Sequence, residues 1–200
     1  MKKLISLLLS MAMVFSMTAV QALAADEETA MLADTGAEGT DAPVAQTVTL
    51  DLSKGSIVIS KTGYKQGGGA QIKFTGAYTI EQSDKSNLTN TIRVEDGEYQ
   101  ITMKDVSIDV SQKGNVCAFM IWPDATVDLK LEGKVTLKSG EYQAGLSVPE
   151  GAAVNISAKT DSDILTVKGG VFAAGIGGGS DDNGGNITIL SGTVNADSEI

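Results

Sequence analysis

The 200-residue sequence has no histidine, and this absence excludes whole classes of chemistry. Without an imidazole, neither a Ser-His-Asp nor a Cys-His catalytic group can form, and the commonest ligand of zinc and iron sites is missing. The single cysteine, Cys117, cannot form an internal disulfide, and its apolar neighbours in NVCAFMIW predict a buried side chain. Stability must then come from an apolar core or from bound metal, and a hydrophobic content of 42% allows a continuous core.

Long apolar runs are also lacking, except at the very start of the chain. Residues 1–24, MKKLISLLLSMAMVFSMTAVQALA, combine two lysines, an apolar stretch and an Ala-Leu-Ala cleavage site. This order is typical of a secretory signal peptide, and the interrupting serines argue against a membrane-spanning helix. We therefore expect a secreted or extracellular cell-surface protein that is not embedded in the membrane.

Basic residues are few, and the formal net charge is -10 at pH 7. Phosphates of nucleic acids and anionic lipids would repel such a chain, so a nucleic-acid partner is not expected. A calcium ion, or a surface bridged by calcium, fits the charge better. Six of the acids fall in residues 25–46, ADEETAMLADTGAEGTDAPVAQ, which contain no base and predict a disordered acidic linker.

From residue 47 onward the sequence alternates apolar and polar residues in short runs broken by Gly, Asp, Asn and Ser. This period of two predicts strands and no long helix. The strands recur as units, because IRVEDGEYQI, MIWPDATVDL, LSVPEGAAVNI and IGGGSDDNGGNITI can be aligned at a spacing near 28 residues. A second series, KDVSID, GKVTLK, ILTVKG and GTVNAD, follows at a similar offset. Two series in register predict an all-β solenoid of about five coils over residues 47–200, and an antiparallel sandwich is the alternative.

The glycine-rich stretch AAGIGGGSDDNGGNITILSGTVNAD fits the corners of such a solenoid. Coils lie about 4.8 Å apart, so residues without a Cβ suit the places where one coil turns against the next. The expected corner residues are Gly175, Gly177, Gly178, Gly179, Gly184 and Gly185. Within the same loop, Asp181, Asp182 and Asn183 could supply oxygens to a calcium ion, and a solvated turn is the alternative.

Aromatic residues make up only 4% of the chain, so few rings are available to stack on a sugar. Trp122 and Asp124 lie in one predicted turn, and Tyr142 lies in the corner SGEYQAG. These three are the candidate carbohydrate-binding residues. In the alignment of coils, Val94 and Val148 take the place of Trp122, which predicts a position beside the core, whereas Tyr142 should be exposed.

The segments TGAYTI, TIRVEDGEYQITMKDVSID, LSVPEGAAVNIS, AAGIGGG and GGNITILSGTVNA carry a family resemblance. Over about residues 47–197 the chain resembles the right-handed parallel β-helix proteins secreted by clostridia and related Gram-positive bacteria, which are described as carbohydrate-binding domain proteins. The resemblance implies a non-catalytic, adhesin-like module that binds acidic plant polysaccharide such as pectin or polygalacturonate, with calcium at the coils, on the cell surface.

Two other functions remain open at this point. A polysaccharide lyase needs calcium held by several acids and a basic group that removes a proton, and Arg93 is the only arginine. Because alternation places Arg93 on the outer face near Glu95 and Asp96, a surface ion pair is the expected role, and we expect no enzyme activity. The other possibility is a structural spacer of a longer surface protein, with the solenoid truncated at its C-terminus, because no polar cap follows the last strand.

Overall fold

The computed structural model describes residues 46–199. The predicted signal peptide at residues 1–24 and the predicted linker up to residue 45 lie outside the described residues. The first strand, β1 (Thr47–Asp51), begins where the alternating pattern begins in the sequence.

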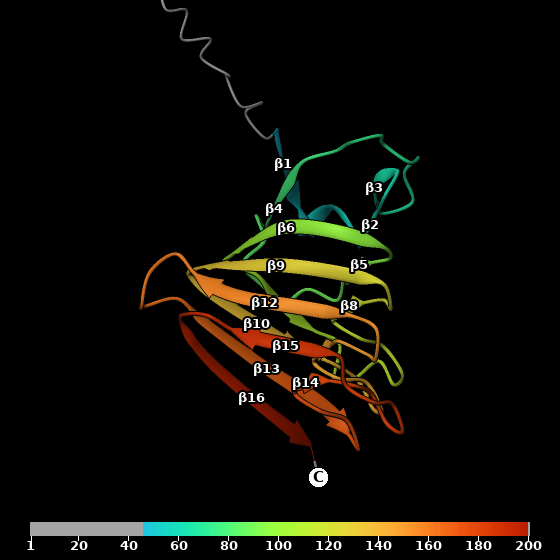
Figure 1. The fold of residues 1–200 in the computed structure, drawn as a ribbon, viewed down its shortest axis with the longest axis vertical. Helices are drawn as coiled ribbons and strands as arrows, with labels where there is room; N and C mark the ends of the chain where they lie inside the picture. Colours follow the sequence, from blue (N-terminus) through green and yellow to red (C-terminus); the bar gives the residue numbers. More distant parts are fainter. Residues whose placement is uncertain (1–45, 200) are drawn as a thin grey trace, which may run out of the picture. The chain divides into compact units, whose positions relative to one another are not determined.

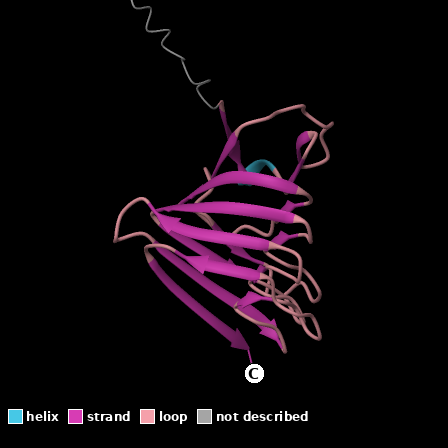
Figure 2. Cartoon of the chain, in the orientation of Figure 1, coloured by secondary structure: helices cyan, strands magenta, loops and turns pink. Residues whose placement is uncertain are grey.

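Strands of the described region form three sheets (Figures 1 and 2), which we call sheets A, B and C. In spatial order, sheet A contains β1, β4 (Ala77–Glu81), β6 (Gly97–Lys104), β9 (Ala125–Glu132), β12 (Ala153–Ala158) and β15 (Asn186–Ile189). Sheet B contains β3 (Gly63–Gln66), β2 (Ile57–Ser60), β5 (Ile92–Val94), β8 (Phe119–Ile121), β11 (Leu146–Ser147) and β14 (Ile176–Gly177). Sheet C contains β7 (Ser107–Asp109), β10 (Lys134–Lys138), β13 (Ile164–Val171) and β16 (Thr193–Glu199), and a short 3-10 helix η1 (Leu52–Lys54) follows β1.

The chain winds through these sheets in a repeating order. In the central coils each strand of sheet A is followed by one of sheet C and then one of sheet B, before the chain returns to sheet A. Equivalent strands of successive coils pair in parallel, and among the named strands only β2 and β3 pair antiparallel. The domain is therefore a right-handed parallel β-helix of about five coils, as the repeat predicted. The antiparallel sandwich is excluded by the parallel pairing.

The observed register of sheet B differs by one residue from the predicted alignment. Ile92 pairs with Phe119 and not with Met120, and Phe119 pairs in turn with Leu146. Side chains of a strand alternate between the two faces, so a shift of one residue exchanges inward and outward positions. The predicted alignment of coils was therefore wrong by one residue for β8. It was right for β11 and β14, where Leu146 pairs with Ile176.

Inward-facing side chains stack in ladders along the solenoid axis. One ladder in sheet A consists of Tyr78, Ile101, Leu129, Ile156 and Ile189. Its first four members are almost completely buried, whereas Ile189 in the last described coil is 52% exposed. Each coil thus covers the core of the coil before it, which is how short alternating strands produce one continuous core.

Glycines permit close contacts at the corners, as expected. A Cβ on Gly178 would lie 2.3 Å from the carbonyl oxygen of Asp182, and one on Gly185 would lie 2.3 Å from that of Ala152. No side chain fits there without displacing the backbone. Gly184 has ordinary van der Waals room, so its predicted close approach is not observed.

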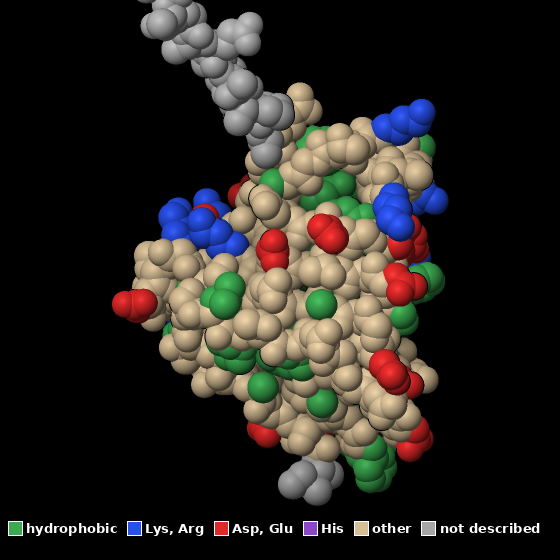
Figure 3. Space-filling view, in the orientation of Figure 1, with side chains coloured by type: hydrophobic (Ala, Val, Ile, Leu, Met, Phe, Trp, Pro, Cys, Tyr) green, Lys and Arg blue, Asp and Glu red, His purple; other side chains and the backbone are tan. Residues whose placement is uncertain are grey.

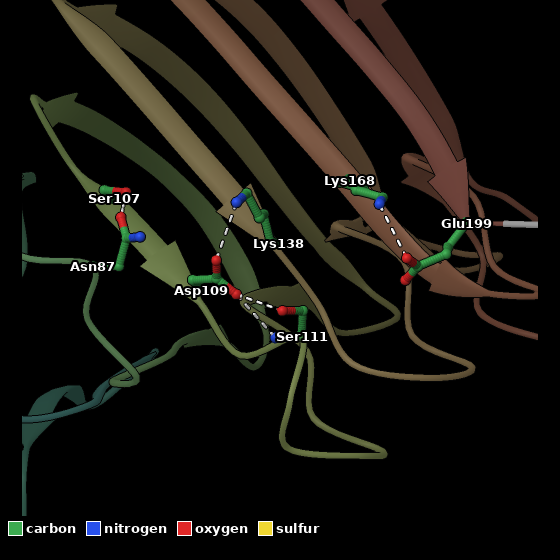
Figure 4. A network of polar contacts seen from close by, with 7 residues as sticks. All are labelled: Asn87, Ser107, Asp109, Ser111, Lys138, Lys168 and Glu199. Carbon is green, nitrogen blue, oxygen red and sulfur yellow. Dashed lines mark hydrogen bonds and ion pairs between the residues drawn. The ribbon is translucent and has the colours of Figure 1, made fainter.

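Polar contacts tie neighbouring coils together on the outer face of sheet C (Figure 4). Lys138 Nζ lies 3.1 Å from Asp109 Oδ2, and Lys168 Nζ lies 3.2 Å from Glu199 Oε1. Such partly exposed pairs contribute on the order of 0–1 kcal/mol each, so the buried ladders dominate stability. No helix in residues 46–199 is long and apolar enough to cross a membrane.

Candidate functional site

An open groove runs over the corner between sheets B and A, near the N-terminal coils. It consists of three adjoining depressions, which contain Trp122, Asp124 and Asp128 respectively. The Trp122 and Asp124 depressions share Ser60 and Lys61, and the Asp124 and Asp128 depressions share Glu98 and Tyr99. We call it the corner groove, and the side chains used below are Lys61, Asp96, Glu98, Trp122, Asp124 and Asp128. An elongated, open depression of this kind suits a linear polymer better than a small enclosed ligand.

Aromatic rings form the floor of the corner groove. Phe74, Tyr78 and Tyr99 pack edge to face, with ring centroids 5.2 Å apart for Phe74 and Tyr78 and 6.2 Å apart for Tyr78 and Tyr99. The Tyr99 hydroxyl donates a hydrogen bond to the backbone oxygen of Asp96, and burial raises the pKa of Tyr99 to about 12. Tyr99 is therefore neutral at physiological pH, and the floor is held in place by packing and by this hydrogen bond.

Trp122 stands at one end of the groove and is 42% exposed. The sequence predicted a position beside the core, which is wrong, because Ile121 and not Trp122 pairs with Val94 and fills the interior. The one-residue shift in register places the indole outside. An exposed tryptophan beside polar groups is a stronger candidate for sugar stacking than the sequence alone indicated.

The indole is held by its neighbours. The guanidinium carbon of Arg93 lies 5.1 Å from the centre of the Trp122 ring, and Arg93 Nη2 donates to Glu95 Oε1 at 2.8 Å. The predicted surface ion pair of Arg93 is thus confirmed. The guanidinium lies over the face of the indole, a cation–π arrangement that favours one orientation of the ring.

Asp124 follows Trp122 in the same turn and adopts a left-handed conformation, with φ of 66°. Its backbone N–H donates to the carbonyl oxygen of Gly151 at 3.1 Å, so the turn is fixed against the next coil. Asp124 lines the same depression as Lys61 and Glu98. The structure therefore brings the predicted residues Trp122 and Asp124 together on one groove.

The corner groove is predominantly acidic. Lys61 Nζ lies 3.4 Å from Asp96 Oδ2, which neutralises one carboxylate, while Glu98, Asp124 and Asp128 have no salt bridge within the described residues. Figure 3 shows acidic side chains on the polar surface over β6 and β9 and lysines gathered at one end of these strands. A polyanion would be repelled here unless a cation bridges it to the protein.

Further polar side chains extend the groove along the outer face of sheet A. Asn155 Nδ2 donates to Asp128 Oδ1 at 2.8 Å, and an adjoining depression is lined by Gln100, Asp128, Lys130 and Ser157. Amides, hydroxyls and carboxylates thus succeed one another from coil to coil. These groups are suited to hydrogen-bond the hydroxyls of a sugar chain.

Tyr142 is exposed, as predicted, but lies at a different corner, between β10 and β11. Its ring stacks on Phe172 of the next coil, with centroids 6.1 Å apart and an interplanar angle of 18°. We call this pair the aromatic corner. Phe172 was not predicted, although EYQAG and VFAAG each place an aromatic residue two positions ahead of an Ala-Gly pair.

The loop with Asp181, Asp182 and Asn183 lies against the backbone of Tyr142. Ser180 N donates to the Tyr142 carbonyl oxygen at 3.0 Å, and Asn183 Nδ2 donates to Glu150 Oε2 at 3.0 Å. Asp181 has φ of 64°, which is typical of a turn residue.

The fit of calcium to this loop depends on what completes the coordination. Residues 46–199 contain no group of three or more acidic, His or Cys side chains placed to hold a metal. Asp181, Asp182 and Asn183 supply two carboxylates and one amide, whereas calcium takes about six to eight oxygens. Backbone carbonyls, water or the carboxylates of a bound polysaccharide would have to supply the rest, so calcium binding at this loop stays a prediction.

Comparison with protein-family models, with curated proteins and with solved structures gives no match for this chain.

Proposed function

We propose that the domain is a non-catalytic carbohydrate-binding module of a secreted or cell-surface protein, and that a linear polysaccharide binds in the corner groove. The observation that carries this proposal is the exposed, oriented Trp122 indole at the end of an open groove lined by carboxylates and hydroxyls. A sugar ring stacks its apolar face on an indole and directs its hydroxyls to such polar groups. Arg93 holds the ring in position, which lowers the entropic cost of binding.

The proposed ligand is an acidic polysaccharide such as polygalacturonate, bound together with calcium. The acidic surplus of the groove makes direct binding of a polyuronate unfavourable, so calcium would supply the charge that links the two sets of carboxylates. This agrees with what the family resemblance implies. Binding should therefore disappear when calcium is removed.

The test is electrophoresis of the purified protein through gels that contain polygalacturonate, with calcium or with a chelator. We expect retardation only with calcium, and about tenfold weaker retardation for Trp122→Ala, since one aromatic stacking contact contributes about 1 kcal/mol or slightly more. Leu190→Ala is the matched control, because it also removes a large apolar side chain from the surface, 67% exposed, away from the groove. Calorimetric titration with calcium, repeated on Asp181→Ala and Asp182→Ala, shows separately whether the loop binds the ion.

The alternatives give different results. A structural spacer would show no retardation on polygalacturonate or on any other polysaccharide, in either buffer. A lyase would release unsaturated uronate that absorbs in the ultraviolet. Equal retardation of wild type and Trp122→Ala would mean that the corner groove is not the binding site.

A further inference from the structure

We infer that the aromatic corner, Tyr142 and Phe172, is a second carbohydrate-binding site that takes a neutral pyranose ring without calcium. The inference rests on the proposed function, because it assigns a further ligand to the same module. It concerns a different corner of the β-helix, between sheets C and B, whereas the corner groove lies between sheets B and A.

Backbone strain is the first observation behind this inference. Tyr142 and Phe172 have φ of 63° and 62°, in the left-handed region that disfavours residues with a bulky side chain. Glycine or asparagine would occupy these positions at less cost. Burial in the core does not explain aromatic residues here, because both side chains are exposed.

Exposure is the second observation. Tyr142 is 45% exposed and Phe172 is 71% exposed, the largest exposure among the large hydrophobic side chains of residues 46–199. The two rings stack almost parallel on each other, so the outer face of the pair and the ring edges form an exposed apolar surface. The Tyr142 backbone is fixed by hydrogen bonds from its N–H to Val171 O and from Ser180 N to its carbonyl oxygen, both 3.0 Å. The position of this surface is therefore well determined.

Polar groups flank the rings. Gln143 follows Tyr142 directly, and its Nε2 donates to Asn115 Oδ1 of the preceding coil at 2.8 Å. Asn115 is exposed, so this amide pair keeps donors and acceptors free at the surface. On the other side lies the loop that begins at Ser180. An exposed aromatic face with amides at its edge is suited to a sugar ring, which has one apolar face and a rim of hydroxyls.

The neighbouring charges select the kind of sugar. Glu141 precedes Tyr142, and Asp181 and Asp182 lie in the loop that contacts the Tyr142 backbone; all three are exposed. The loop that carries Asn115 adds one exposed base, Lys113, so the acids outnumber the bases around the aromatic corner. Without calcium a uronate carboxylate would be repelled, whereas a neutral hexopyranose would not. Two rings also offer much less area than the roughly 800 Å² per partner of a stable protein interface, so a sugar fits better than a protein.

The test compares Phe172→Asn with wild type. Asparagine accepts the left-handed conformation, so the substitution removes the ring and relieves strain at the same time. We expect a melting temperature that is unchanged or slightly raised, together with about tenfold weaker binding of neutral polysaccharide. The probes are soluble β-glucan, β-galactan and β-mannan, measured by affinity electrophoresis with and without chelator. Phe172→Trp should restore binding, since a larger ring keeps the stacking surface.

Each outcome decides the inference separately from the proposed function. Loss of neutral-polysaccharide binding in Phe172→Asn, with chelator-independent binding in wild type and in Trp122→Ala, supports it. No binding of wild type to any of the three neutral polysaccharides, or equal binding by Phe172→Asn, overturns it. A clear fall in melting temperature for Phe172→Asn would also overturn it, because the ring would then serve stability. Retention on polygalacturonate that depends on calcium and is lost in Trp122→Ala reports on the corner groove, so failure of one proposal does not imply failure of the other.

Discussion

Replacing Gly140 by alanine tests whether close backbone contact at the corners sets the spacing of the coils. A Cβ on Gly140 would lie 1.6 Å from the carbonyl oxygen of Gly114 in the preceding coil. Ordinary contact needs about 3.4 Å or more, so the two corners would have to separate by nearly 2 Å. That movement breaks the hydrogen bond from Gly140 N to Val116 O, 2.9 Å, and disturbs the one from Val116 N to Gly114 O, 2.8 Å.

The expected cost follows from these contacts. Each lost hydrogen bond costs about 1 kcal/mol, and forced overpacking costs about 1–3 kcal/mol more. We therefore expect Gly140→Ala to lower the free energy of unfolding by about 2–5 kcal/mol. The assay is urea denaturation followed by circular dichroism, with the slope of the transition compared between variants, because a solenoid can lose its coils separately.

Gly68→Ala is the matched control. A Cβ on Gly68 meets no atom within 4 Å, and its φ is not in the left-handed region, so the same substitution should change stability by less than about 1 kcal/mol, in the stabilising direction. If Gly140→Ala unfolds at the same urea concentration as Gly68→Ala, the corners do not limit the spacing of the coils and the reasoning is refuted.

Three further predictions concern the core and the titratable groups. Leu129→Ala should lower the free energy of unfolding by about 3 kcal/mol. Ile189→Ala should lower it by clearly less, because Ile189 belongs to the same ladder but is half exposed. Equal losses would contradict the ladder description. Hydrogen bonds from backbone N–H groups hold the pKa of Asp163 below its usual range, so its stabilisation is present above about pH 4 and is lost as the pH falls further. The melting temperature of Asp163→Asn should accordingly be lower at neutral pH and less dependent on pH in acid, and an unchanged acid slope would argue against this role. Burial raises the pKa of the Cys117 thiol to about 11, so it should react with a disulfide reagent only after unfolding, whereas fast labelling of the native protein at about pH 8 would contradict its burial.

The prediction of Trp122 shows where sequence reasoning failed. The turn repeats from coil to coil, but its copies differ in length, and one residue decides whether Ile121 or Trp122 faces the core. Strand alternation fixes which residues share a face and leaves open which face is inside. Pairing with Val94 settles the question, and the sequence contains no local signal for it.

The sequence does contain a signal for the aromatic corner. Tyr142 was predicted to be exposed and is, and Phe172 occupies the same place in the next coil. The spacing of the repeat, applied to EYQAG and VFAAG, would have paired them. Their left-handed conformation could not be read from the sequence, because aromatic residues rarely adopt it.

The sequence by itself determined the class of this fold, because alternation of period two and recurrence near 28 residues are local properties that a solenoid repeats in every coil. It also determined the burial of Cys117 and the outward position of Arg93. Only the tertiary structure decided which side chains meet across coils: Trp122 with Arg93, Tyr142 with Phe172, and Lys61 with Asp96. The physical reason is that each site joins residues one or more coils apart, or on the two sides of a corner, and their meeting depends on inter-coil register, which a single strand does not encode.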